Sequence, residues 1–383
     1  MGIYLDYNAS APLDERVLYF MVDVYKNVYG NADSRTHTYG DSARKIVEDA
    51  RGHVAALLSV DQGEVFFTSG STESNNIAIR GLKKYAQESG KRHIITSTIE
   101  HKAVLETVKS LEQEGFEIEL IDPEEDGRVD LNKFLGRVRK DTLLVSLMHA
   151  NNETGVIQPV KEIGEALAAR NVLFHVDATQ SCGKLVSELR ELKYDMLSLS
   201  AHKLSGPQGV GALILRKKCY RLPPVKAIMY GGQQEHGIRP GTVPVALVAG
   251  LGKACELANL EFELNIKAYK ENKAVVTKLI QESGLTYKIN GTQEYCMPNT
   301  INVSFIGVDS EALMLSTRQY CAISNGSACT SHDYSPSYVL KAMGLDEDRI
   351  SSAVRLSWGA RTKKDELMTQ VGNLIKGAKG LRL

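Results

Sequence analysis

The sequence predicts an α/β fold, with a large domain built on a mostly parallel sheet and a smaller α+β unit after it. Between about residues 60 and 216, short β-rich runs alternate with helical patterns, which is typical of a parallel sheet covered by helices on both faces. Beyond residue 299, further strand and helix patterns follow one long helical stretch. The 383 residues are enough for two or three domains.

The N-terminal half is expected to begin with an extended arm at 3–11 and a helix over about 13–28. Asp41 is expected to cap a second helix with apolar residues at helical spacing. A third helix is expected from the turn at 69–75 to about Tyr85. The expected strands are 64–68, 92–97, 143–149, 171–177, 195–200 and 209–215.

The C-terminal half begins with a polar, glycine-rich loop at 231–242. A long helical region is expected from Pro244 to Gly284 and connects the two domains. The smaller unit is then expected to contain strands at 299–305 and 354–358, a helix from Ser310 and a C-terminal helix.

Composition excludes several classes of protein. With 46 basic and 46 acidic residues, the chain has no net charge that would attract nucleic acid or an anionic membrane. No apolar run approaches the length of a membrane span, and the N-terminus lacks a signal region. The six cysteines contain no C-x-x-C pair, so neither a metal site nor a disulfide framework is expected. A soluble, cytoplasmic protein with reduced thiols is expected.

A lysine at the end of a predicted strand is the first candidate for chemistry. Leu197 and Leu199 alternate with serines as in a strand, and residues 205–207 then break the element, which places Lys203 at the strand end or in the next loop. A lysine that is desolvated, or lies beside a second cation such as His202, loses its proton and attacks carbonyl groups. The alternative is a solvated surface lysine.

A carboxylate at the end of a second predicted strand provides a partner for Lys203. Asp177 ends the run 171–177. An acid for a pyridinium nitrogen and a lysine for an aldehyde are the pair that pyridoxal phosphate requires. At about 4 Å and an effective dielectric of about 20, the acid–pyridinium pair contributes roughly 4 kcal/mol before desolvation. The alternative is that Asp177 caps the next helix.

Other polar groups also follow predicted strands. Ser71 and Thr72 stand where a turn enters a helix, which suits a phosphate, although serine and threonine also cap many helices. His101 could stack on an aromatic cofactor and move protons, or it could cap a helix. Asn152 could bind a phenolic oxygen or form a turn. Because the ends of parallel strands meet at one edge, we expect these residues to share a site.

One cysteine differs from the others in its surroundings. Cys329 lies among small and polar residues at 324–336 that have neither helical nor strand periodicity. Because cysteines are usually buried, an exposed and mobile position predicts that Cys329 is the reactive thiol. The other cysteines are predicted to be structural: Cys182, Cys219, Cys255, Cys296 and Cys321.

In combination these residues resemble the NifS/IscS-type cysteine desulfurases, pyridoxal-phosphate enzymes of the aspartate aminotransferase fold (fold type I). The resemblance runs along essentially the whole chain and rests on eight motifs in the same order. They are Tyr4-Leu-Asp-Tyr-Asn-Ala9, Thr68-Ser-Gly-Ser-Thr-Glu-Ser74, Glu100-His101, Asn151-Asn-Glu-Thr-Gly155, Val176-Asp-Ala-Thr-Gln180, Ser200-Ala-His-Lys203, Arg239-Pro-Gly-Thr242 and Ser327-Ala-Cys-Thr-Ser331. The last resembles the branch with a long cysteine loop rather than the SufS-like branch.

The resemblance implies a role for each matching residue. Lys203 would bind the cofactor aldehyde, Asp177 the ring nitrogen and Gln180 the region of the phenolic oxygen, with His101 stacked on the ring. Cys329 would accept the sulfur. The phosphate would be held by Thr72, Ser200 and His202 together with Thr242 of the partner subunit in a homodimer, and the substrate carboxylate by Asn31, Asn152 and Arg355.

The implied reaction converts L-cysteine to L-alanine and leaves a persulfide on Cys329 for an acceptor protein. Iron–sulfur cluster assembly, tRNA thiolation and DNA phosphorothioation are all open as acceptor systems. The alternatives are a selenocysteine lyase or another β-eliminating enzyme of this fold and, more remotely, a non-catalytic sulfur-assembly scaffold. The resemblance implies a seven-stranded sheet in a large domain of residues 15–258. The small domain would comprise residues 1–14 and 259–383, including a cysteine loop at about 321–336.

Overall fold

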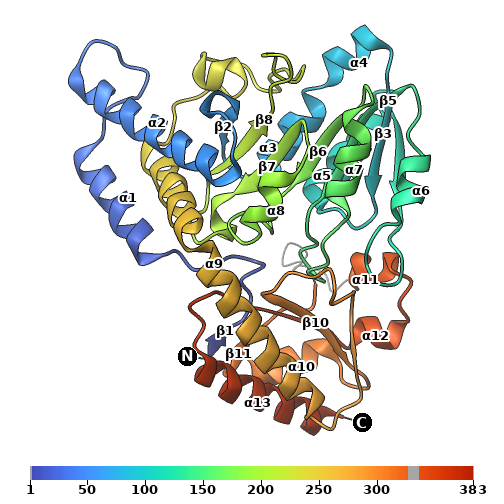
Figure 1. The fold of residues 1–383 in the computed structure, drawn as a ribbon. Helices are drawn as coiled ribbons and strands as arrows, with labels where there is room; N and C mark the ends of the chain where they lie inside the picture. Colours follow the sequence, from blue (N-terminus) through green and yellow to red (C-terminus); the bar gives the residue numbers. More distant parts are fainter. Residues whose placement is uncertain (1, 327–335, 383) are drawn as a thin grey trace.

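The computed structural model describes residues 2–326 and 336–382, and its main layer is a seven-stranded sheet within these residues. The strand order is β2-β8-β7-β6-β5-β3-β4 (Figure 1). β8 is antiparallel to both of its neighbours, and the other pairs are parallel, which confirms the predicted sheet. The strands are β2 Val65–Thr68, β3 His93–Ser97, β4 Glu117–Ile121, β5 Thr142–Met148, β6 Leu173–Asp177, β7 Met196–Ser200 and β8 Gly211–Leu215.

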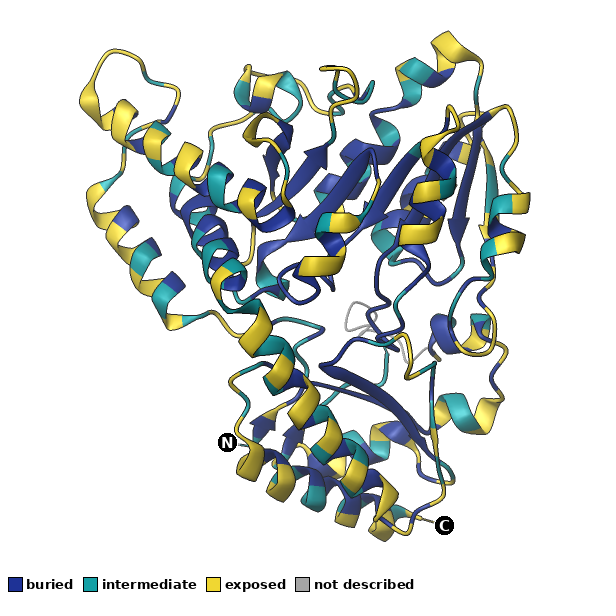
Figure 2. Cartoon of the chain, in the orientation of Figure 1, coloured by how far each residue is buried: buried dark blue, intermediate teal, exposed yellow. Residues whose placement is uncertain are grey.

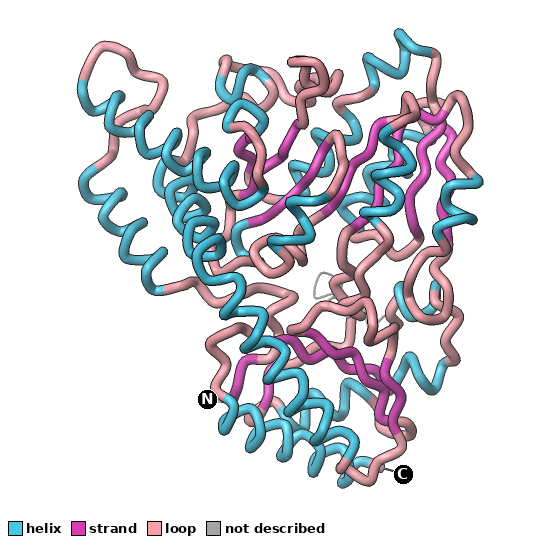
Figure 3. The backbone as a smooth tube through the Cα atoms, viewed as in Figure 1, coloured by secondary structure: helices cyan, strands magenta, loops and turns pink. Residues whose placement is uncertain are grey.

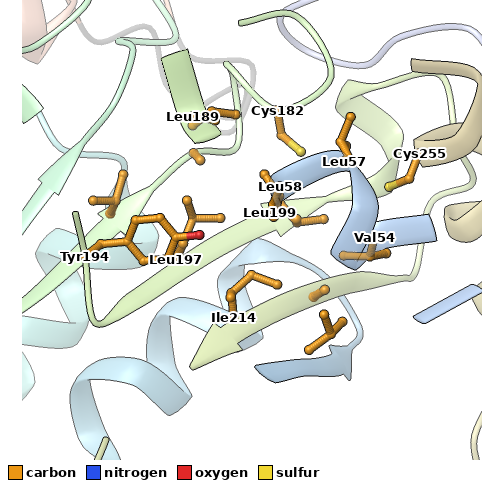
Figure 4. Close-up of a cluster of buried hydrophobic side chains, with 14 of the residues drawn as sticks. Val54, Leu57, Leu58, Cys182, Leu189, Tyr194, Leu197, Leu199, Ile214 and Cys255 are labelled. Atoms are coloured by element: carbon orange, nitrogen blue, oxygen red, sulfur yellow. The ribbon is translucent and has the colours of Figure 1, made fainter. Parts of the chain in front are cut away.

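Successive residues of the central strands pack into different apolar clusters, because side chains alternate between the faces of a sheet. Leu197 and Leu199 of β7 join the cluster formed with α2, α7 and α8, part of which Figure 4 shows. Met196 joins the cluster formed with α3, α4 and α5. The central strands are consequently buried on both faces (Figure 2). These helices are α2 Thr38–Leu58, α3 Ser71–Arg80, α4 Lys83–Ser89, α5 Lys102–Glu112, α6 Leu131–Gly136, α7 Val160–Ala168 and α8 Val186–Glu191.

A second core surrounds a three-stranded antiparallel sheet of order β12-β10-β9 and the parallel pair β1 and β11. Trp358 and Phe305 are fully buried in this core. The chain enters the unit at β1 and returns to it after the large sheet, so both termini lie there (Figure 1). Its elements are β1 Ile3–Tyr4, β9 Tyr287–Ile289, β10 Thr300–Phe305, α10 Ser310–Thr317, β11 Cys321–Ala322, α11 Tyr338–Ala342, α12 Glu347–Ser351, β12 Ala353–Ser357 and α13 Lys364–Leu381.

Helix α9, Val245–Gln281, joins the two cores, as the sequence predicts. Its N-terminal part packs on α2 and on α1 (Glu15–Asn27), where Gly252 lies so close to α2 that a Cβ atom would be 2.5 Å from Ala50 Cα. Its C-terminal part contributes Tyr269 and Val276 to the second core. No helix among the described residues has both the length and the apolar character needed to cross a membrane.

Two local predictions are wrong. Asp41 does not cap α2, because the helix begins at Thr38 and His37 Nδ1 accepts a hydrogen bond from the Gly40 N–H. The helix after β2 does not continue to Tyr85 but ends at Arg80. Gly81 passes so close to the chain at 225–226 that a Cβ atom would lie 2.6 Å from Val225 Cγ1, and a new helix starts after the break.

Candidate functional site

A pocket of about 180 Å³ is lined by residues of the large sheet's loops and of the smaller unit. Figure 3 shows the loops that lie between the large sheet and the smaller unit. Most of its residues follow a strand end, as expected for a parallel α/β sheet. The lining consists of Asn8, Ala9, Ser71, Thr72, His101, Met148, Ala150, Asn152, Asp177, Thr179, Gln180, His202, Lys203 and Arg355. The structure therefore brings together nine of the predicted site residues: Ser71, Thr72, His101, Asn152, Asp177, Gln180, His202, Lys203 and Arg355.

Lys203 lies in a short 3-10 turn, Ala201–Lys203, directly after β7. The side chain is partly buried, and its Nζ donates hydrogen bonds to the backbone oxygens of Asn8, at 2.6 Å, and Ala9, at 2.7 Å. The lysine is thus held by the N-terminal arm rather than solvated on the surface. This position gives the amine a fixed direction at the edge of the sheet.

Asp177 is the last residue of β6 and is buried. Oδ1 accepts hydrogen bonds from the N–H and the hydroxyl of Thr179, and Oδ2 accepts one from Asn75 Nδ2 at 2.8 Å. The next helix starts only at Val186, so Asp177 does not cap it. Three hydrogen-bond donors hold this carboxylate in one orientation.

Glu100 is a buried neighbour of Asp177 that was not predicted as a site residue. Oε1 accepts a hydrogen bond from the Met148 N–H, whereas Oε2 has no partner among the described residues. Burial, and next the charge of Asp177, raise the pKa of Glu100 well above its usual value. Burial therefore favours the neutral form of the Glu100 carboxyl group.

His101 caps a helix, which was one of its two predicted alternatives, and it also lines the pocket. It is the N-cap of α5, where Nδ1 accepts a hydrogen bond of 3.1 Å from the Ala103 N–H. Because Nδ1 acts as an acceptor, the neutral ring carries its proton on Nε2. The cap thereby fixes the tautomer of a histidine that lines the pocket.

The start of α3 forms a polar end of the pocket. Gly70 is the N-cap and provides no side chain, so the first N–H groups of α3 keep their capacity to bind an anion. Ser71 and Thr72 line the pocket beside them. Ser200 is buried at the end of β7, with Oγ 3.7 Å from where a Gly70 Cβ would lie, but it does not line the pocket. Burial lowers the pKa of His202 to about 4, so its ring is neutral.

Arg355 enters the pocket from β12 of the smaller unit and is only 1% exposed. Nη2 pairs with Asp6 at 2.5 Å, and Nη1 donates a hydrogen bond of 2.8 Å to the backbone oxygen of Asn152. Nε has no partner among the described residues. Asp6, which also accepts a hydrogen bond from the Ser324 hydroxyl, was not predicted as part of the site. The buried Oδ1 of Asn152 and Oε1 of Gln180 likewise have no partner within the described residues.

Asn31 and Thr242 do not line the pocket. Both are exposed, and Asn31 Oδ1 accepts a hydrogen bond from the Asp33 N–H. The loops that carry them are connected, since Gln234 Nε2 donates to Asp33 Oδ2 at 2.8 Å. The two residues therefore lie on connected surface loops.

The cysteines are only partly as predicted, and Cys329 itself lies outside the described residues. Burial raises the pKa of Cys182 and of Cys321 to about 12, and it also raises the pKa of Cys255 and Cys296, which fits structural roles. Cys219 is a correction, because it is exposed. It lies in the turn closed by the backbone pairing of Lys218 with Arg221, so it is not buried as a structural cysteine would be.

The comparison with protein families gives one model, Aminotransferase class-V, that matches residues 3–369. The chain belongs to the class-V aminotransferase family. It is 44% identical to a cysteine desulfurase IscS of Histophilus somni, covering 100% of this chain and 94% of the relative. It is 45% identical to a protein of the same name in Haemophilus influenzae, covering 99% and 93%.

Solved structures of this family have the same fold. A NifS-like protein matches with a TM-score of 0.90 and 35% identity, covering 100% of both chains. DndA from Streptomyces lividans matches with a TM-score of 0.80 and 40% identity over 93% of this chain and 99% of its own. SspA in complex with cysteine matches with a TM-score of 0.80 and 34% identity over the same shares. The predicted family and its fold type are thereby confirmed.

Proposed function

We propose that the protein is a pyridoxal-phosphate-dependent cysteine desulfurase, which releases L-alanine from L-cysteine and leaves a persulfide on Cys329. The observation that carries this proposal is that Lys203, Asp177 and Arg355 line one pocket. The amine matches the aldehyde of the cofactor, and the fixed carboxylate matches its ring nitrogen. The buried guanidinium matches the carboxylate of an amino acid. The names of the relatives, and the SspA structure with cysteine, support the same substrate.

The pocket fits pyridoxal phosphate by its donor set. Lys203 would take the aldehyde and Asp177, held by three donors, the ring nitrogen. The unpartnered amide oxygens of Gln180 and Asn152 show that the pocket contains polar atoms without a protein partner among the described residues. The phosphate would be held by the start of α3 with Ser71, Thr72, Ser200 and His202. When bound, the cofactor supplies an electron sink for bonds at the α-carbon of the substrate.

The residues of the chain then bind the substrate and move its protons. Arg355 holds the substrate carboxylate, since its Nε has no other partner in the described part of the chain, and Asn152 lies next to it. The proton is carried either by Lys203, through Nζ, or by His101, through Nε2. His101 keeps the correct tautomer because the Ala103 N–H occupies Nδ1.

Cys329 receives the sulfur. Its thiolate attacks the sulfur of the substrate, the new S–S bond forms, and the C–S bond breaks with its electron pair going to the carbon that becomes the methyl group of alanine. The sulfur then passes to an acceptor protein. Cys182, Cys255 and Cys321 are poor substitutes, because burial raises the pKa of each thiol.

The functional unit is proposed to be a homodimer in which Thr242 completes the phosphate site of the second subunit. Thr242 is exposed and does not line the pocket of its own chain, which supports an action across an interface. Asn31 lies on a loop joined to the same region through Gln234 and Asp33, so we assign it to the pocket of the second subunit as well. The cytoplasmic location remains a prediction.

Alanine formation and protein persulfide test the proposed function. The full-length protein with L-cysteine should form both, and Cys329→Ala should still bind pyridoxal phosphate but release no alanine. The matched control replaces the exposed Cys219 by alanine and should retain activity. Full activity of Cys329→Ala would contradict the mechanism. Sulfur transfer from the persulfide to candidate acceptor proteins then separates iron–sulfur assembly, tRNA thiolation and DNA phosphorothioation.

A further inference from the structure

An acidic side chain, Glu73, lies at the end of the pocket that is proposed to hold the cofactor phosphate. It belongs to the first turn of α3 and directly follows Ser71 and Thr72, which line the pocket. The side chain of Glu73 is 12% exposed, and its Oε2 accepts a hydrogen bond from the Ser69 N–H. Residues 69–72, the phosphate turn, are thereby held in shape by a carboxylate.

A carboxylate at this position has two opposite effects. It stabilises the helix start, because it caps a backbone N–H and lies at the positive end of the helix dipole. It also repels a phosphate monoester, which carries about 1.5 to 2 negative charges near neutral pH. Burial raises the pKa of Glu73, but the hydrogen bonds from Ser69 and Arg239 lower it by more, so the carboxylate is ionised near neutral pH. A phosphate beside it therefore requires a compensating cation.

Arg239 provides this cation from the loop that also carries Thr242. Its Nε donates a hydrogen bond of 3.1 Å to Glu73 Oε1, the oxygen that the Ser69 N–H does not use. The two side chains are 22% and 12% exposed, so solvent and salt screen this ion pair less than a pair on the open surface. Both oxygens of the Glu73 carboxylate thus have a donor, and one donor carries a positive charge.

The loop of Arg239 is anchored on the strand that leads into the phosphate turn. Glu235, four residues before Arg239, is buried and accepts a hydrogen bond of 2.8 Å from the Phe67 N–H of β2. It also forms an ion pair of 2.8 Å with the buried Arg51 of α2. The loop is therefore attached to β2 through Glu235 and to α3 through Arg239, which gives the Arg239 guanidinium a fixed place.

We propose that Arg239 is a positioning residue for the cofactor phosphate, which neutralises the Glu73 carboxylate so that this carboxylate can hold the phosphate turn in shape without repelling the phosphate. This inference rests on the proposed function, in which the phosphate lies at the start of α3. The loop at 231–242 then serves the phosphate end of its own chain through Arg239 and that of the second subunit through Thr242.

The affinity for the cofactor tests this role without any need for cysteine turnover. The full-length protein is freed of its cofactor and titrated with pyridoxal 5′-phosphate and, separately, with pyridoxal, which lacks the phosphate. Arg239→Gln should weaken the binding of pyridoxal phosphate about tenfold and leave that of pyridoxal within about twofold. Adding Glu73→Gln to Arg239→Gln should restore the affinity for pyridoxal phosphate to within about threefold of the unmodified protein, because the carboxylate that needs a cation is then absent.

Glu73→Gln alone keeps an acceptor for the Ser69 N–H and leaves the charge of Arg239 in place. It should bind pyridoxal phosphate at least as tightly as the unmodified protein, which retains the test if the Arg239 variant does not fold. Arg80→Gln is the matched control, because Arg80 forms an ion pair with Glu114 at the other end of α3 and does not line the pocket. Its affinity should stay within about twofold.

An unchanged affinity of Arg239→Gln for pyridoxal phosphate, or weaker binding by Glu73→Gln, would overturn the proposal. A double variant no better than Arg239→Gln, or an equal loss for pyridoxal, would also overturn it, since the arginine would then act only through the shape of the pocket. A protein that binds as expected but forms no alanine would contradict the proposed function and leave the role of Arg239 standing. Alanine formation with an unaffected Arg239→Gln affinity would overturn this inference alone.

Discussion

At the scale of single residues, the pocket already contains the charge partner of its arginine. Asp6 holds Arg355 at one nitrogen, Asn152 accepts from a second, and Nε is left without a partner among the described residues. A substrate carboxylate would therefore meet a guanidinium whose direction is fixed before binding. Such preorganisation strengthens binding because little side-chain entropy remains to be lost.

Arg355→Lys should raise the KM for cysteine about tenfold or more while cofactor binding is retained, because an ammonium cannot reproduce the planar fork of the guanidinium. Initial rates over a range of cysteine concentrations, with cofactor content measured on the same samples, check this. Arg349→Lys is the control, since Arg349 bonds to Asn290 and the Ile289 oxygen and does not line the pocket. An unchanged KM in the Arg355 variant would assign Arg355 a purely structural role.

At the scale of elements, the two cores are joined by one helix whose packing depends on a glycine. Gly252 of α9 touches α2 at Ala50, so any added side chain must push these helices apart. The change from the first core to the second occurs between Phe262, which still packs on the first core, and Tyr269, and the domain boundary at residue 258 stays a prediction.

Gly252→Ala should lower the free energy of unfolding by about 1–3 kcal/mol, the usual cost of overpacking a tight contact. Gly372→Ala is the matched control: it also lies inside a helix, α13, but an added Cβ atom would have no neighbour within 4 Å. The control should be neutral or more stable by about 0.5–1 kcal/mol, because alanine favours the helix. Denaturant unfolding of both variants decides this. Equal stability of the two would show that α2 and α9 adjust without cost.

The sequence could predict those parts of the fold and site that follow a strand. Asp177 and Lys203 were found because buried apolar runs end at or next to them, and parallel strands place such ends together. Asp6 and Glu100 lie within the quoted motifs but were not given a role in the site, because no local pattern around them indicates one. Asp6 pairs with Arg355 across 349 positions, and the role of Glu100 depends on its complete burial. Long-range pairing and burial are properties of packing, which local patterns do not specify.

At the scale of the whole molecule, the proposed phosphate site requires two subunits, because Thr242 does not line the pocket of its own chain. Thr242 is exposed, and several tyrosines of α1 and the start of α2 are exposed as well, including Tyr19, Tyr25 and Tyr39. Large exposed aromatic side chains are enriched in interfaces. The exposed aromatic residues support the proposed homodimer.

Mixed dimers test whether Thr242 acts across the interface. A dimer with one Lys203→Ala subunit and one Thr242→Ala subunit has one complete site if Thr242 serves the second subunit, and none if it serves its own. We therefore expect the mixture to recover about half of the cofactor binding and activity per mixed dimer, as one of two sites is intact. The two homodimeric variants are the controls. A mixture no more active than these controls would place Thr242 in its own subunit.

The N-terminal arm, described above as the support of Lys203, is also a structural part of the pocket. The backbone oxygen of Asn8 accepts hydrogen bonds from both Lys203 and Gln180, and the side chain of Asp6 holds Arg355. The arm runs from the second core past the pocket, with the Asn8 N–H anchored on Ser357. Proteolytic trimming of about ten residues, which is harmless at many chain ends, would here remove supports of the nucleophile and of the substrate arginine together. Susceptibility to aminopeptidases is therefore a vulnerability of the catalytic centre itself.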